Sequence, residues 1–281
     1  MDSALDLCEV DMHCHTTASD GILTPTELVC LASKLGLKGV GITDHDTIQG
    51  WREAEEAGET YQVVILRGIE LNTDWQGKEV HILGYELDGT SKYLNDKLLY
   101  LQRAREQRML EILERLRIQG IELDVDEVKQ YSQGESIGRP HIAQALMIQG
   151  YVESVREAFD RFIGSGAPAY VPRYKLTPEE GIELVREAHG VAVLAHPGIQ
   201  KLEERIPYWT EMGLQGIEVL HSEHKAEDAV FYRALAAKYG LLVTGGSDFH
   251  GEERKPGAKL GNWGMPLTIV KEIQNLAQHF K

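Results

Sequence analysis

Hydrophobic and polar positions follow a strand-then-helix order at the start of the chain. Residues 5–15 (LDLCEVDMHCH) and 38–46 (KGVGITDHD) are apolar runs that end in polar residues, as buried strands do at the rim of a sheet. Residues 24–36 between them have helical periodicity, with Thr24 at the N-cap and Gly36 after the last turn. This order is typical of βα units around a mostly parallel sheet.

Two more strands are predicted at residues 63–71 (VVILRGIEL) and 79–87 (EVHILGYEL), with a turn at 72–78 between them. From 92 to 119 the pattern becomes helical and contains many i,i+4 charge pairs. Shorter helical segments follow, with little strand character. We therefore predict a helical insertion at residues 91–167.

Helix and strand alternate again after the insertion. Three strands, each preceded by a helix, are predicted within residues 177–198 (TPEEGIELVREAHGVAVLAHPG), 213–224 (GLQGIEVLHSEH) and 240–251 (GLLVTGGSDFHG). The pattern predicts an α/β fold in which residues 8–90 and 168–281 form one domain.

Composition limits the ligands that this fold can take. The chain has 281 residues, of which 42% are hydrophobic, so it is long enough to bury a large core. Its formal net charge is −15, which disfavours non-specific binding to a long nucleic-acid duplex. A ligand that carries phosphate must therefore meet a local cluster of positive charge.

Three cysteines, Cys8, Cys14 and Cys30, lack the paired CxxC spacing, so we expect free thiols in a reducing compartment. The acidic N-terminus differs from a secretory signal, and no apolar run approaches the ~20 residues needed to cross a bilayer. These features predict a soluble cytoplasmic protein with no membrane partner.

His13 and His15 are two residues apart on a predicted strand, so both imidazoles face the same side and Cys14 faces the other. That arrangement offers two nitrogen ligands to one metal ion. An isolated HxH pair is also common on surfaces and in cores, so the pair alone leaves both interpretations open.

More histidines and acids follow at the ends of other predicted strands. Because ligands of parallel α/β sheets bind at the carboxyl ends of the strands, we expect these side chains to converge there. Only His81 lies inside its predicted strand. The set comprises Asp44, His45, Asp46, Glu70, His81, His196, Asp248 and His250.

Imidazole nitrogens mixed with carboxylate oxygens suit Mn²⁺, Zn²⁺ and Fe²⁺, and the lack of usable cysteine argues against a closed structural zinc site. The set exceeds what one ion needs. It predicts two or three divalent ions, with Mn²⁺ favoured, provided that one carboxylate bridges between ions.

The motifs HCHTTASDG, GITDHDT, GIEL, HILGY, AHPG and GSDFHG resemble, in order and spacing, those of the polymerase and histidinol phosphatase (PHP) superfamily of metal-dependent phosphoesterases. The resemblance covers residues 10–85 and 191–251. It implies a distorted (β/α)7 barrel with three metal ions at its C-terminal rim. The segment IGRPHIAQALM in the insertion resembles the subgroup that acts on nucleotides.

The resemblance also implies which residues hold each ion, and in this pattern Glu70 bridges the first and second ions. It leaves Asp11 as a structural residue. The implied ligands are His13, His15, Glu70 and Asp248 for the first ion, Glu70, His81 and His196 for the second, and Asp20, His45 and His250 for the third.

Substrate contacts are predicted outside the metal ligands. Arg139 and His141 in the insertion, and Arg173 and Lys175 at its exit, offer cations to phosphate, although a solvated loop is an equal interpretation for Arg173 and Lys175. His224 matches a position that contacts phosphate in similar proteins, and we expect it to donate a proton to the leaving oxygen.

The predicted reaction is hydrolysis of a phosphoester by a metal-bound hydroxide. The resemblance implies that the substrate is a 3′,5′-nucleotide bisphosphate, which would yield a nucleoside 5′-monophosphate, or a short 5′-phosphorylated oligoribonucleotide. Two alternatives are a histidinol-phosphate phosphatase and a non-catalytic metal-dependent binding module.

Overall fold

A computed structural model describes residues 8–131 and 138–278. The chain divides into two compact units. The first, Met1–Asp96 with Lys175–Lys281, is called the barrel unit here, and the second, Lys97–Tyr174, is called the helical unit. Each unit is described by itself.

The barrel unit contains one seven-stranded sheet in which the strands follow chain order. β4 runs antiparallel to both of its neighbours, and the other pairs are parallel. After β7, the chain returns to β1, where the amide of His15 donates to the carbonyl of Phe249 at 2.8 Å. The sheet is therefore a nearly closed barrel, as predicted. Its strands are β1 (Val10–Cys14), β2 (Gly39–Ile42), β3 (Val64–Trp75), β4 (Lys78–Tyr85), β5 (Val191–Leu194), β6 (Gly216–His221) and β7 (Leu242–Gly246).

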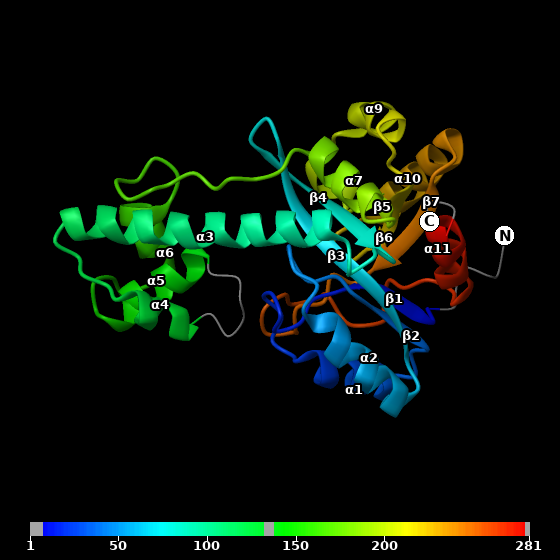
Figure 1. The fold of residues 1–281 in the computed structure, drawn as a ribbon, viewed down its shortest axis with the longest axis horizontal. Helices are drawn as coiled ribbons and strands as arrows, with labels where there is room; N and C mark the ends of the chain where they lie inside the picture. Colours follow the sequence, from blue (N-terminus) through cyan, green and yellow to red (C-terminus); the bar gives the residue numbers. More distant parts are fainter. Residues whose placement is uncertain (1–7, 132–137, 279–281) are drawn as a thin grey trace. The chain divides into compact units, whose positions relative to one another are not determined.

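Helices pack on the outside of this barrel (Figure 1). Two of them begin as the sequence predicts. At the start of α1 and of α7, the side chain of Thr24 or Thr177 accepts from the third helical amide, and a proline occupies the first turn. The helices are α1 (Pro25–Lys34), α2 (Gly50–Tyr61), α7 (Pro178–Glu187), α8 (Pro197–Gln200), α9 (Ile206–Glu211), α10 (Ala226–Tyr239) and α11 (Thr268–Gln278), with a 3₁₀ turn at Glu203–Arg205.

Helix α11 was not predicted. Its apolar residues, among them Ile269, Val270 and Ile273, are buried against strand residues of the barrel. None of the helices in the described ranges is both long enough and apolar enough to span a membrane. The three cysteines are free thiols.

The prediction of a turn at residues 72–78 was wrong in length. β3 continues to Trp75, and the turn consists of Gln76 and Gly77, which have φ angles of 53° and 85°. Two consecutive left-handed residues form the type of tight hairpin turn that glycine favours. Glu70 therefore lies inside β3. Because β4 is antiparallel, its first half reaches the rim where the parallel strands end, which explains why His81 lies within a strand.

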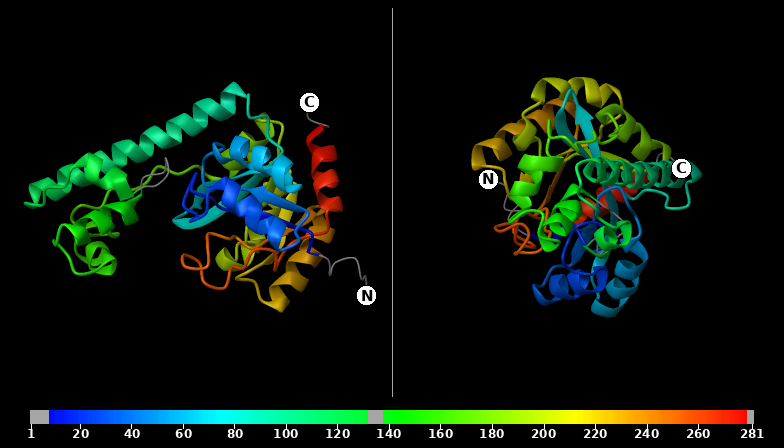
Figure 2. Two further views of the ribbon diagram at one scale, coloured as in Figure 1. Left: turned by 90° about the horizontal axis from the view of Figure 1, so that it is seen from below. Right: turned by 90° about the vertical axis from the view of Figure 1, so that its left-hand side faces the viewer.

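The helical unit contains the predicted helices. They are α3 (Lys92–Ile118), whose first turn belongs to the barrel unit, α4 (Val125–Tyr131), α5 (Arg139–Ile148) and α6 (Val155–Ala158), which continues as a π-helical turn at Phe159–Ile163. Helices α4 to α6 lie along one side of α3 (Figure 2). Apolar residues of α3, such as Ile112 and Leu116, and of α5, such as Ile142 and Leu146, form one buried core there.

Candidate metal centre

Glu70 lies at the centre of the barrel rim and is surrounded by five imidazoles. Its carboxylate is 1% exposed. The imidazoles come from β1, β2, β4 and β5 or the residues that follow them, so they are brought together only by the closed sheet. The nitrogen-to-oxygen distances are 3.3 Å for His13, 3.0 Å for His15, 3.1 Å for His45, 2.7 Å for His81 and 3.0 Å for His196.

Two aspartates extend this cluster. Oδ1 of Asp248 lies 3.2 Å from Nε2 of His15 and 3.3 Å from Nδ1 of His250. Oδ1 of Asp20 lies 3.3 Å from Nε2 of His250. Asp248 has a left-handed φ of 55°, a conformation that a non-glycine residue adopts at a cost and that recurs at functional sites.

Many polar atoms of the cluster are buried and make no hydrogen bond. Buried donors and acceptors almost always have partners, so a group of unpartnered ones facing each other requires an explanation. Divalent ions between them would satisfy the carboxylate oxygens and one nitrogen of each imidazole, and these nitrogen and oxygen donors fit such ions. The atoms include His13 Nε2, both ring nitrogens of His15, His45 Nδ1, His81 Nε2, Glu70 Oε2 and Asp248 Oδ1.

The ligand atoms form several compact groups, in each of which all atoms lie within 4.8 Å of one another. One group contains the whole set predicted for the first ion, and another contains the set predicted for the third ion together with His15. These groups are His13, His15, Glu70 and Asp248, and His15, Asp20, His45 and His250; a third comprises His45, Glu70 and His81.

The acids and histidines of the cluster shift one another's pKa values. Burial opposes ionisation of Glu70, but the surrounding histidines, His45 and His81 first, hold its pKa well below the usual range. Burial also disfavours the imidazolium of His15, yet the adjacent carboxylates of Asp248 and Glu70 raise its pKa to about 10. Glu70 likewise raises the pKa of His81 to about 9 against the effect of burial. The carboxylates thus attract cations strongly.

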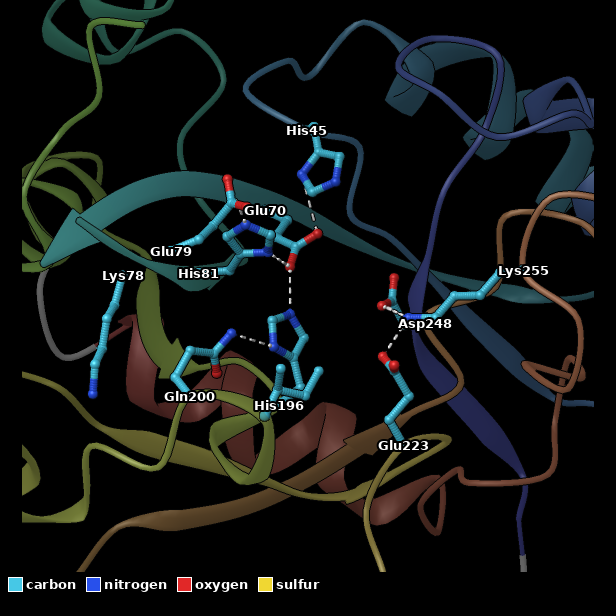
Figure 3. Close-up of a pocket in the computed structure, with 11 residues that line it drawn as sticks. His45, Glu70, Lys78, Glu79, His81, His196, Gln200, Glu223, Asp248 and Lys255 are labelled. Carbon is cyan, nitrogen blue, oxygen red and sulfur yellow. Dashed lines mark hydrogen bonds and ion pairs between the residues drawn. The ribbon is translucent and has the colours of Figure 1, made fainter. Parts of the chain in front are cut away.

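The cluster opens into a cavity of about 560 Å³ (Figure 3). Its wall combines predicted ligands with charged and polar side chains of the hairpin and the loops. The lining residues are His45, Glu70, Lys78, Glu79, His81, His196, Ile199, Gln200, Glu223, Asp248 and Lys255. A small anionic ligand can reach the acid and imidazole groups from this side.

The PHP domain family model matches residues 11–195. The chain belongs to the PHP domain family. It is 34% identical over 248 residues to a 5′-3′ exoribonuclease of Haemophilus influenzae, covering 85% of this chain and 89% of that protein. It is 31% identical over 250 residues to a 3′,5′-nucleoside bisphosphate phosphatase of Chromobacterium violaceum, covering 87% and 88%.

A solved structure shares the fold. It is a chain from Bifidobacterium adolescentis that is provisionally classed as a metal-dependent phosphoesterase, with a TM-score of 0.80, 36% identity, and coverage of 95% of this chain and 96% of that one. Together with the family match, these similarities confirm the predicted family, the predicted barrel and the prediction of a phosphoesterase.

Three acids near the rim have structural partners. Asp11 accepts from the amides of Ser247 and Gly261 at 2.9 and 2.7 Å, as its predicted structural role requires. Asp44 accepts from the amide of Thr16 and the hydroxyl of Ser19.

Asp46 accepts from both the amide and the side chain of Asn72 at 2.9 Å. Asp44 and Asp46 therefore hold rim loops in place, and neither belongs to the compact ligand groups found among the described residues.

Glu218 and His221 also lie in this cluster, although the sequence pattern does not identify either as a site residue. Glu218 is fully buried in β6, where it accepts from Nδ1 of His13 and from the amide of His196. Nε2 of His221 is buried without a hydrogen bond, 3.5 Å from Oδ2 of Asp248. The sequence does contain one indication of Glu218, because it is an acid inside the apolar run GIEVL. A carboxylate buried in a strand needs specific partners, which points to a role in a site.

The structure places His224 differently from the prediction. Its Nδ1 donates to the carbonyl of Val219 at 2.9 Å, and its Nε2 accepts from the amide of Gly198 at 3.1 Å. Because backbone groups use both nitrogens and His224 does not line the cavity, the geometry does not favour a phosphate contact or proton donor here. His224 instead joins β6 to the start of α8.

Lys175 also differs from the prediction of a phosphate contact. Its ammonium lies 2.7 Å from Oε1 of Glu79 and 4.0 Å from Oδ2 of Asp74, so two acids of the β3–β4 hairpin already neutralise it. Oε1 of Glu79 lies 3.7 Å from Nε2 of His81. Lys175 thus fixes an acid beside a predicted metal ligand.

The other predicted cations lie in the helical unit. The Arg139 guanidinium donates to the carbonyl of Ile163 at 3.3 Å, and Nδ1 of His141 accepts from the amide of Gly138 at 3.1 Å. Burial and then the charges of Arg139 and Arg173 lower the pKa of Arg108 to about 10. Because the charges of Arg139 and Arg173 act on Arg108, the three arginines lie within electrostatic range of one another.

Proposed function

We propose that the chain is a metal-dependent phosphoesterase that converts 3′,5′-nucleotide bisphosphates to nucleoside 5′-monophosphates and acts from the 5′ end on short oligoribonucleotides. One observation carries the proposal, namely the buried Glu70 carboxylate among five imidazoles with unpartnered ligand atoms. The named activities of the relatives from H. influenzae and C. violaceum support the substrate class.

We propose two or three divalent ions, with Mn²⁺ first and Zn²⁺ or Fe²⁺ as alternatives. Bound ions would supply activation of water and neutralisation of phosphoryl charge. The proposed ligands are those of the implied pattern: His13, His15, Asp20, His45, Glu70, His81, His196, Asp248 and His250.

The chain's own residues orient these ligands and select the substrate. Glu218 fixes the ring of His13, and Glu79 lies beside the ring of His81. We assign phosphate binding in the helical unit to Arg139 and Arg173, with Arg108 beside them. A net charge of −15 leaves few positive regions, which favours a nucleotide or short oligonucleotide over a long duplex.

The test combines metal analysis with a substrate panel. The purified protein is analysed by mass spectrometry for bound metals and then assayed, with Mn²⁺, Zn²⁺ or Fe²⁺, on 3′-phosphoadenosine 5′-phosphate, short 5′-phosphorylated RNA and histidinol phosphate. We expect two or three metal ions per chain and turnover of the nucleotide substrates. Turnover of histidinol phosphate alone would replace the proposal with the first alternative.

A variant separates an enzyme from a binding module. Glu70→Gln removes the carboxylate shared by five imidazoles, and we expect loss of metal and of hydrolysis. The matched control is Glu252→Gln, which removes one charge from an exposed position. The binding module would be the better interpretation under two joint results. Glu70→Gln would lose its metal, and the wild-type protein would bind nucleotide without hydrolysing any substrate of the panel.

A further inference from the structure

Lys255 reaches the edge of the metal centre from the loop after β7. Its ammonium bonds to Oδ2 of Asp248 and lies 2.9 Å from Oε2 of Glu223. It lines the cavity, and Figure 3 shows it between these two carboxylates. Its side chain is 26% exposed, so the ammonium is accessible from the cavity while it is held by both acids.

The carboxylate of Asp248 faces two ways. Oδ1 faces His13 and His15 and has no hydrogen-bond partner. Oδ2 faces Lys255 and Nε2 of His221. Lys255 therefore does not occupy the oxygen that faces the imidazole cluster, and it can keep its position when that oxygen binds a cation.

The backbone fixes Lys255 at this point. The amides of Arg254 and Lys255 donate to the carbonyl of Gly251 at 3.1 and 2.9 Å, which forms a tight turn directly after His250. Gly251 has a φ of 102°, and a side chain there would collide with Ile22. The turn thus links Lys255 rigidly to two predicted ligands.

The cavity is lined by several carboxylates, so an anion that enters it needs a positive charge to bind to. Glu70, Glu79, Glu223 and Asp248 all line the cavity, and an anionic substrate must approach them. Lys78 also lines it but is exposed and points away from Glu70 in Figure 3. An ammonium has three donors, and Asp248 and Glu223 use two of them, which leaves one for another acceptor.

We propose that Lys255 is a substrate-binding residue that contacts a non-bridging oxygen of the phosphate to be hydrolysed, and that Glu223 and Asp248 aim it. This inference rests on the proposed function and names a contact within it. The ligand chemistry is a phosphate group with at least one anionic non-bridging oxygen, which the monoester and diester substrates of the proposed function both provide. Arginine would keep the charge but not the compact three-donor geometry.

The test measures phosphate binding and turnover separately. Wild type, Lys255→Met, Lys255→Arg and the control Lys259→Met, an exposed lysine of the same loop, are loaded with Mn²⁺. Inorganic phosphate is titrated into each by calorimetry, metal content is measured by mass spectrometry, and kcat and KM are determined on the best substrate.

For Lys255→Met we expect phosphate affinity to fall about tenfold or more and KM to rise by a similar factor, with metal content unchanged. Lys255→Arg should recover part of the affinity, and Lys259→Met should match wild type. Unchanged phosphate affinity in Lys255→Met would overturn the inference. Loss of metal with an unchanged KM would also overturn it, because Lys255 would then only hold Asp248 in place. Phosphate binding is readable even if no panel substrate is hydrolysed, so the two proposals fail separately.

Discussion

Nδ1 of His13 lies 3.0 Å from Oε1 of Glu218, and both side chains are fully buried inside the barrel. The second oxygen of Glu218 accepts from the amide of His196 at 2.8 Å. One carboxylate therefore orients a ring on β1 and the backbone after β5. When Nδ1 of His13 donates to Glu218, Nε2 is left as an acceptor that faces Glu70 and Asp248, which is the state a metal ligand requires.

Replacing Glu218 with glutamine should therefore weaken metal binding without removing any proposed ligand. We expect Glu218→Gln to lower Mn²⁺ affinity by about 10- to 100-fold. Affinity is measured by competition with a fluorescent chelator. Glu187→Gln, at an exposed position of α7, is the control. Equal affinities in Glu218→Gln and the control would show that Glu218 does not orient the site.

Much of the fold and of the candidate site could be predicted because both depend on the pattern of residues within short segments of the sequence. The carboxyl ends of parallel strands meet at one rim, so an imidazole or acid directly after a buried strand has few other places to go. His15, His45, His196 and Asp248 all satisfy this rule. The three-residue capping pattern likewise predicts the starts of α1 and α7.

What could not be predicted depends on contacts between distant segments. His224 has a ligand-like position in the sequence, but whether its nitrogens are free depends on Gly198 and Val219. Lys255 looks like a solvated loop residue until the fold places Glu223 beside it. The antiparallel direction of β4 also escaped detection, because a buried strand has the same pattern in either direction.

Asp44 holds the loop that carries Asp20. It accepts from the amide and the hydroxyl of Thr16 at 2.7 and 2.8 Å and from the hydroxyl of Ser19 at 2.6 Å. In Asp44→Asn, one acceptor oxygen becomes a donor that faces other donors. We expect the free energy of unfolding to fall by about 1.5–3 kcal/mol.

The same change should release one metal ion selectively. Asp20 belongs to the group of the third proposed ion, so metal content measured by mass spectrometry should fall by one ion while the group around Glu70 keeps its metal. Asp126→Asn on α4 controls for loss of charge. Full metal content in Asp44→Asn at limiting Mn²⁺ would contradict this account of the loop.

Metal binding should release protons at mildly alkaline pH. In the metal-free protein the pKa of His15 is about 10 and that of His81 about 9, because Asp248 and Glu70 outweigh the effect of burial. Both rings are therefore protonated at about pH 8, and a histidine must lose that proton to bind a metal. Calorimetric titration of Mn²⁺ in two buffers with different ionisation enthalpies should show net proton release. A heat independent of the buffer would refute this.

The same pKa values fix the pH dependence of the metal-free protein. They lie above the ordinary histidine value of 6.5, so the folded state binds these protons more tightly than the unfolded state. Their contribution to stability is complete below pH 6.5 and is lost as the pH rises through 9 to 10. Chelator-treated protein should thus unfold at a lower urea concentration near pH ~9.5 than near pH ~7, whereas saturating Mn²⁺ should remove most of that difference.

A substitution of Leu146 tests whether the helical unit unfolds as a separate domain, as the predicted helical insertion at residues 91–167 implies. Its side chain is fully buried between helices of that unit. Leu146→Ala should destabilise the unit by about 2–5 kcal/mol, because truncation leaves a cavity. Leu110→Ala on α3, where the leucine is 45% exposed, serves as the control and should cost much less.

Hydrogen exchange locates the damage from Leu146→Ala. If the units unfold separately, amide protection in Leu146→Ala falls within Lys97–Tyr174 and stays at the wild-type level in the strands of the barrel unit. The Mn²⁺ affinity of this variant should also equal that of wild type. A matching loss of protection in both units would mean that they unfold as one cooperative structure. The proposed phosphate-binding arginines of the helical unit would then depend on the barrel unit for their stability.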